Sequence, residues 1–178
     1  MKILVAGVGS TLWGDDGFGV EVAHRLMEMQ LPSEVRVVET GTGGIHLVQE
    51  LTAGFDAAIV IDATDRGRPP GTVMVIHPEV DDVHDMDDDT KYAYLADMHY
   101  TKPDKALMLA RALNVLPGKL ILVGCQPQDP ERYGKGLAEP VQAAVDVAVK
   151  EVLSLVDGLL KSNGQPESTQ ISAKPTDG

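Results

Sequence analysis

The chain has 178 residues, of which 43% are hydrophobic, and this composition predicts one globular domain rather than a disordered chain. Its net charge of −12 argues against nucleic acid and anionic membranes as partners, because both would repel it. A single cysteine excludes an intramolecular disulfide, and without a signal segment or a membrane-length apolar run we expect a cytoplasmic protein.

The first apolar run and the glycine-rich stretch after it are the most informative part of the chain. Residues 2–6 predict a buried strand, and residues 7–19 read Gly-Val-Gly-Ser-Thr-Leu-Trp-Gly-Asp-Asp-Gly-Phe-Gly. The glycines allow a tight turn. The adjacent carboxylates of Asp15 and Asp16 would repel a phosphate and attract a cation. We expect one of them to cap the following helix and the other to project into a crevice.

Apolar strands and amphipathic helices alternate along the rest of the chain. Further strands are expected at 35–39, 57–62, 72–77 and 120–123, and helices at 19–29, 44–51, 103–113 and 139–160. The strand at 57–62 is apolar on both faces, as a parallel sheet requires. The acidic segment 78–98 is expected to be a solvated loop and the polar tail 162–178 to be disordered. The pattern predicts a three-layer α/β domain over residues 1–161.

Two aspartates are expected where an open parallel sheet binds its ligands, beyond the carboxyl ends of its strands. Asp62 ends the third strand, and Asp16 lies in the loop after the first. A cap at the strand end is the competing interpretation of Asp62. His99 precedes a helix, and two carboxylates with one imidazole would suit a first-row divalent ion. The sequence alone does not show that the three side chains meet, and it contains no serine-hydrolase elbow or zinc-protease helix motif.

Several blocks of the chain resemble the hydrogenase maturation endopeptidases. These blocks are residues 7–12 with 15–19, Ile61-Asp62-Ala63 with Pro70-Gly71-Thr72, His99 before a helix, Leu122-Val123-Gly124-Cys125-Gln126-Pro127, and Gly136-Leu137. The resemblance extends over residues 1–155. Two features depart from the family pattern: Ala138 stands where a serine commonly follows Gly-Leu, and the segment 81–89 is rich in aspartate.

The resemblance implies an α/β/α sandwich around a mixed five-stranded sheet of order 2-1-3-5-4, with the fourth strand antiparallel. It also implies an endopeptidase that removes a short C-terminal extension from the precursor of a nickel-iron hydrogenase large subunit after nickel insertion. Asp16, Asp62 and His99 would contact the nickel that the precursor carries, with a metal-mediated catalytic role. Either the ion or a water that it activates assists cleavage, or the three residues only recognise the loaded precursor.

Two other functions fit parts of the sequence. A dinucleotide-binding oxidoreductase is suggested by Gly7-x-Gly9 after a strand and by Glu39 at the end of the next strand. The third glycine of that fingerprint is missing, because Leu12 stands in its place. A non-catalytic binding module that checks the metal content of the same precursor would use the same aspartates and histidine.

Overall fold

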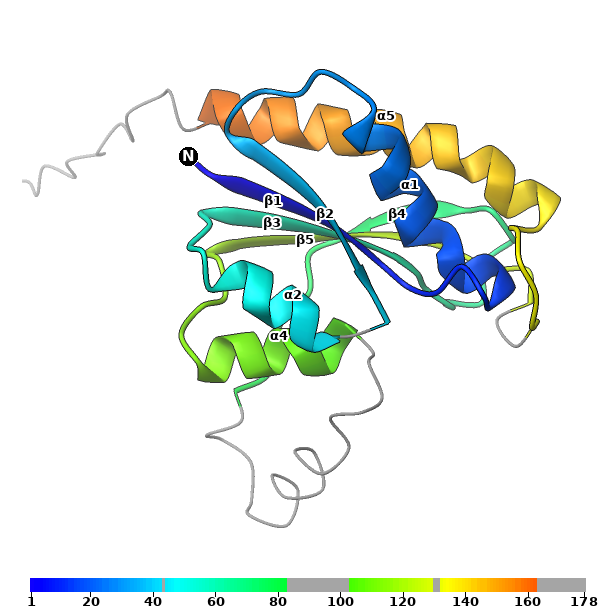
Figure 1. Ribbon diagram of the computed structural model, residues 1–178, viewed down its shortest axis with the longest axis horizontal. Helices are drawn as coiled ribbons and strands as arrows, with labels where there is room; N and C mark the ends of the chain where they lie inside the picture. Colours follow the sequence, from blue (N-terminus) through cyan, green and yellow to red (C-terminus); the bar gives the residue numbers. More distant parts are fainter. Residues whose placement is uncertain (43, 83–102, 130–131, 163–178) are drawn as a thin grey trace, which may run out of the picture.

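A five-stranded sheet crosses the middle of the molecule, with helices on both of its faces (Figure 1). The structure, a computed structural model, describes residues 1–42, 44–82, 103–129 and 132–162. Its strands are β1 (Ile3–Val8), β2 (Val35–Gly41), β3 (Ala57–Ala63), β4 (Val73–Ile76) and β5 (Lys119–Cys125). Its helices are η1 (Gly14–Gly17), a 3-10 turn, and α1 (Phe18–Met27), α2 (Gly44–Leu51), α4 (Pro103–Ala112) and α5 (Glu139–Ser162).

The strand order is β2-β1-β3-β5-β4, and β4 runs antiparallel to β5 while the other described pairs are parallel. The predicted fold class and strand order are therefore confirmed. The three central strands, β1, β3 and β5, end at the same edge of the sheet. The loops that follow them consequently share one end of the molecule (Figure 1).

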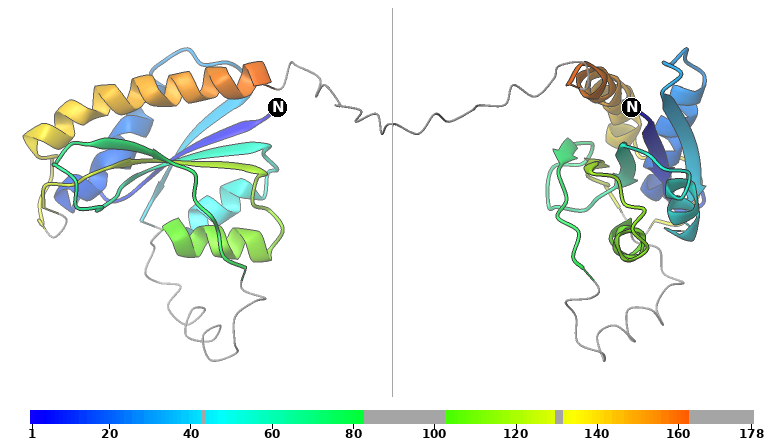
Figure 2. Two further views of the ribbon diagram at one scale, coloured as in Figure 1. Left: turned by 180° about the vertical axis from the view of Figure 1, so that it is seen from behind. Right: turned by 90° about the vertical axis from the view of Figure 1, so that its left-hand side faces the viewer.

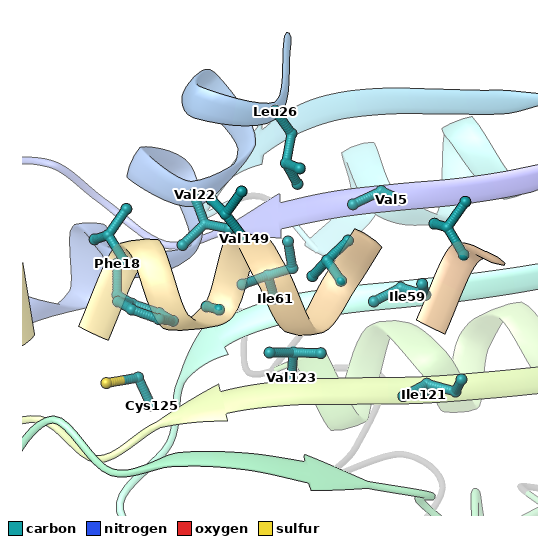
Figure 3. Close-up of a cluster of buried hydrophobic side chains, with 14 of the residues drawn as sticks. Val5, Phe18, Val22, Leu26, Ile59, Ile61, Ile121, Val123, Cys125 and Val149 are labelled. Carbon is teal, nitrogen blue, oxygen red and sulfur yellow. The ribbon is translucent and has the colours of Figure 1, made fainter. Parts of the chain in front are cut away.

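The central strands are buried on both faces because each face is covered by its own pair of helices. Helices α1 and α5 lie on one face, and α2 and α4 lie on the other (Figure 2). Along β3, Ile59 and Ile61 belong to the first core cluster, whereas Ala58 and Val60 belong to the second. Figure 3 shows part of the first cluster, where side chains of β1, β3 and β5 pack against side chains of α1 and α5 on one face of the sheet. The two-sided apolar pattern predicted for this strand is confirmed.

Two glycines bring the start of α1 against the sheet. A Cβ atom on Gly19 would lie 2.2 Å from the carbonyl oxygen of Ile61, and one on Gly7 would lie 2.2 Å from the carbonyl oxygen of Gly19. Because no larger residue fits at either contact, the helix backbone packs directly on β1 and β3. This contact also fixes the position of η1, the turn that carries Asp15 and Asp16.

The first helix differs at both ends from the prediction of 19–29. Its C-terminal end tightens after Met27, where the N–H of Glu28 donates to His24 and the N–H of Met29 donates to Leu26, so the helix stops before Pro32. Its N-terminal side begins with the 3-10 turn.

The predicted loop 78–98 is described only as far as residue 82, without a helix or strand there, and residues 163–178 of the predicted tail lie outside the described residues. Among the described helices, none combines the length and the apolar character that crossing a membrane needs.

Candidate active site

The loop between β1 and α1 presents Asp16 at the carboxyl edge of the sheet. Gly9 has a φ of +126°, a conformation that side-chain-bearing residues rarely adopt, and a Cβ there would lie 1.8 Å from the carbonyl oxygen of Asp16. The N–H of Ser10 donates to Oδ2 of Asp16 at 2.6 Å. The loop therefore folds back on itself and fixes the carboxylate of Asp16 at the point where β1 ends.

Asp62 reaches the same edge from β3. It lies one position beyond Ile61, which pairs with Gly7 of β1, and it is itself the register partner of Gly124 in β5. A cavity of about 600 Å³ opens at this edge of the sheet. Asp16 and Asp62 both line this cavity, which we call the acidic pocket. The parallel register thus brings together two residues that are far apart in the sequence.

The acidic pocket is a costly place for two negative charges. Burial, the larger cause, and the nearby charge of Asp16 together raise the pKa of Asp62 to about 8, against the opposing effect of the Ala63 backbone N–H. Burial also raises the pKa of Asp16, and the hydrogen bond from the N–H of Ser10 opposes this rise. A proton or a bound cation would relieve the repulsion between the two carboxylates, so the pair fits a site for either.

The third predicted ligand, His99, lies outside the described residues. Within the described part of the chain, no group of three or more histidine, cysteine, aspartate or glutamate side chains could hold a metal ion. Asp16 and Asp62 share a pocket, and the metal-binding and catalytic roles of Asp16, Asp62 and His99 stay predictions.

Asp15 is not a helix cap, and neither is Asp16, because the structure has no side-chain cap bond at the start of η1 or α1. Instead, the fully buried Asp15 carboxylate joins its own segment, between β1 and α1, to the distant loop between β5 and α5. Its Oδ2 accepts the N–H of Gln128 at 2.8 Å and the N–H of Asp129 at 3.3 Å, and its Oδ1 accepts the N–H of Ala138 at 2.7 Å. The capping prediction for this pair was wrong because the helix starts from the 3-10 turn, and Asp15 is directed away from it.

Cys125 ends β5 near this contact but is no candidate nucleophile. It is buried and has a free thiol. Burial and the neighbouring Asp15 charge raise the pKa of the thiol to about 12, so the reactive thiolate is scarce at neutral pH. The pocket chemistry therefore belongs to carboxylates rather than to a cysteine.

Gln126 organises the loop after β3, a role that the sequence alone does not reveal. This side chain is 5% exposed, and its Oε1 accepts the N–H groups of Arg66 at 2.7 Å and Arg68 at 3.1 Å. Its Nε2 donates to Oδ1 of Asp65 at 2.8 Å, and this bond, with one from the N–H of Gly67, lowers the pKa of Asp65. The only signal in the sequence was the breaker-rich composition of this loop, which does not specify a partner sixty residues away.

An aromatic pair links the loop between β1 and α1 to the loop between β5 and α5. Trp13 and Tyr133 meet edge to face with ring centroids 5.2 Å apart, and they are 47% and 74% exposed. The backbones of these two loops are also paired. The N–H of Gly14 donates to the carbonyl oxygen of Gly134, and the N–H of Gly134 donates to the carbonyl oxygen of Leu12. The two loops are therefore held together, and we call their paired segments, around Trp13 and Tyr133, the joined rim.

Glu39, which the dinucleotide hypothesis would place on a ribose, is paired within the protein. Its Oε2 lies 2.5 Å from Nε2 of His24 on α1. The third glycine of the dinucleotide fingerprint is also missing, since Leu12 stands in its place. Neither the glycine-rich loop nor Glu39 therefore supports dinucleotide binding.

A family model, a related sequence and two solved structures show which known proteins this chain is similar to. A family model described as hydrogenase maturation protease matches residues 20–155. The hydrogenase expression/formation protein HoxM of Azotobacter vinelandii is 35% identical over 159 residues, which cover 87% of this chain and 72% of HoxM. A hydrogenase 2 maturation peptidase from a Thaumarchaeota archaeon has a similar structure, with a TM-score of 0.65 at 34% identity over 88% of this chain and 99% of that one. The hydrogenase maturating endopeptidase HybD of E. coli has a TM-score of 0.69 at 28% identity over 89% of this chain and 93% of HybD.

Proposed function

The chain belongs to the hydrogenase maturation protease family, and from this premise we propose that it removes a C-terminal extension from the nickel-loaded precursor of a nickel-iron hydrogenase large subunit. It is a peptide hydrolase, as its family and its structural relatives are. The proposal places the reaction in the cytoplasm, which suits a protein whose single cysteine is a free thiol.

The observation that carries this proposal is the pair of carboxylates in the acidic pocket. Asp16 and Asp62 are close enough for one charge to raise the pKa of the other, and a divalent cation between them would remove that repulsion. Two carboxylates leave most coordination positions of a first-row ion open, which suits an ion already held by another protein. Nickel is thus part of the substrate, and His99 is the proposed third contact.

The raised pKa of Asp62 also suits proton transfer. In peptide hydrolysis, water adds its oxygen to the carbonyl carbon, the C–N bond breaks, and a proton passes to the leaving amine. In the metal-free protein, a carboxyl group with a pKa of about 8 holds a proton at neutral pH. A divalent cation bound at Asp62 would displace this proton, and the carboxylate could then accept a proton from the attacking water. When nickel is bound nearby, it supplies a Lewis acid that polarises the carbonyl group.

The test compares nickel-loaded with nickel-free precursor as substrate for the purified protein. Intact-mass measurement of the precursor before and after incubation should show loss of the C-terminal peptide from the loaded form only. Equal cleavage of both forms would contradict recognition of the metal. An unchanged mass with stable binding would instead support the non-catalytic module.

Two aspartate variants assign the chemistry to the pocket. Asp62→Asn keeps the shape of the side chain and removes its charge and its proton exchange, so it should abolish cleavage. Asp146→Asn is the matched control, because Asp146 is exposed on α5 and forms an ion pair with Arg25, away from the acidic pocket. Full activity of Asp62→Asn would remove Asp62 from the site.

A further inference from the structure

The acidic pocket has one positively charged side chain among its described lining residues, and that side chain is Arg66. The other charged groups of the lining are carboxylates, those of Asp16, Asp62, Asp65 and Asp104. A carboxylate repels the partial negative charge of a peptide carbonyl oxygen and, when ionised, cannot donate a hydrogen bond to it. A guanidinium group carries five N–H donors and no acceptor, so it is suited to this oxygen.

Arg66 also stands where two cavities adjoin. A second cavity of about 540 Å³ shares Arg66, Asp104 and Leu122 with the acidic pocket. Its lining includes apolar side chains of β4 and α4, such as Ile76 and Leu107. An extended peptide that occupies both cavities would pass Arg66, which lines each of them.

The backbone at Arg66 is held in place by a buried side chain. Gln126 accepts the N–H of Arg66 and, two residues further on, that of Arg68, so the loop between them has a fixed path. The Arg66 side chain itself is exposed and makes no hydrogen bond or ion pair with another side chain among the described residues. Its N–H donors are consequently available to a ligand in the pocket.

We propose that Arg66 is a substrate-binding residue that pairs with the carbonyl oxygen at the cleaved peptide bond and, after hydrolysis, with the new C-terminal carboxylate of the processed subunit. This inference rests on the proposed function, because it takes the substrate to be a peptide cleaved in the acidic pocket. Hydrolysis turns a neutral carbonyl group into a carboxylate, and a guanidinium binds a carboxylate through two parallel hydrogen bonds. Arg66 therefore binds the product end more tightly than the uncleaved chain.

The first test measures cleavage of the precursor that the wild-type protein processes. Arg66→Ala should lower kcat/KM by about tenfold to a hundredfold, mainly through KM, because a charge-assisted hydrogen bond is lost. Arg66→Lys should recover part of this loss, since it keeps the charge without the forked geometry. Arg68→Ala is the matched control: Arg68 is exposed in the same loop and does not line the acidic pocket. Equal kinetics of Arg66→Ala and Arg68→Ala would overturn the proposal.

The second test measures binding without catalysis. A synthetic peptide of the processed C-terminus is titrated into the wild-type protein, once as the free acid and once as the C-terminal amide. The free acid should bind about tenfold more tightly than the amide, and Arg66→Ala should abolish this difference. A preference for the free acid that persists in Arg66→Ala would overturn the role of Arg66. Failure of the wild type to cleave any loaded precursor would instead contradict the proposed function.

Discussion

Replacing Asp15 by alanine should destabilise the whole domain, a structural role that the sequence did not predict for either aspartate of the Asp15-Asp16 pair. The variant removes one buried carboxylate that accepts three backbone N–H groups, from Gln128, Asp129 and Ala138. A buried donor left without a partner costs about 1–3 kcal/mol. Water can reach part of this exposed loop, so the lower end of that range applies and the three losses sum to about 3 kcal/mol.

Two further variants turn this estimate into an ordered series. Asp15→Asn keeps one oxygen for the two donors at Oδ2 and places an amide nitrogen against the third, so its loss should be about 1–2 kcal/mol. Asp146→Ala breaks only the exposed ion pair with Arg25 and should cost less than about 1 kcal/mol. The expected order of destabilisation is therefore Asp15→Ala, then Asp15→Asn, then Asp146→Ala.

The assay is urea unfolding followed by far-ultraviolet circular dichroism, with the free energy of unfolding extrapolated to water for each variant. All four proteins should show the same dependence on urea, so that the midpoints report stability alone. If Asp15→Ala unfolds within about 0.5 kcal/mol of the wild type, the buried carboxylate does not hold the two loops together and the reasoning is wrong.

Two other predictions follow from contacts described above. The pKa of Asp62 is raised to about 8 from an ordinary value of 3.8, so the folded state binds this proton more tightly and loses stability as the pH rises between these values. In chelator-treated protein, the unfolding free energy of Asp62→Asn should therefore exceed that of the wild type by a margin that grows from about pH 5 to about pH 8; a margin independent of pH would count against the shift. Gly19→Ala should lower the free energy of unfolding, measured by the same urea assay, by about 3 kcal/mol or more, because its methyl group would lie 2.2 Å from the carbonyl oxygen of Ile61. Gly158→Ala, with no atom within 4 Å, should raise stability by up to about 1 kcal/mol, and similar losses in both variants would refute the close packing of α1 on the sheet.

The strands were predictable because burial on two faces leaves a simple mark in the sequence. The run Ala57-Ala58-Ile59-Val60-Ile61 is apolar at every position, and the structure places alternate residues in two separate cores. The order of the strands within the sheet could not be predicted from burial patterns. Hydrophobic patterns do not say which strands are neighbours, and the order came from the family resemblance alone.

The parts of the site that were missed depend on long-range contacts with backbone groups. Asp15 binds N–H groups more than 110 residues away, and Gln126 binds those of a loop about 60 residues earlier. Backbone N–H groups are present at almost every residue, so such partners leave no pattern of residue types. Asp16 and Asp62 were easier to find, because each follows a strand whose end could be located. His99 stays a prediction.

The joined rim carries a fluorescent reporter that is part of the protein itself. Trp13 is the only tryptophan of the chain, and it stands in the loop that leads to Asp16, half exposed and against the ring of Tyr133. Tryptophan fluorescence depends on the polarity around the indole ring and on contact with neighbouring groups, and in this protein all of it comes from Trp13. Arrival of a partner at the carboxyl edge can thus be followed in real time by fluorescence of the unlabelled enzyme.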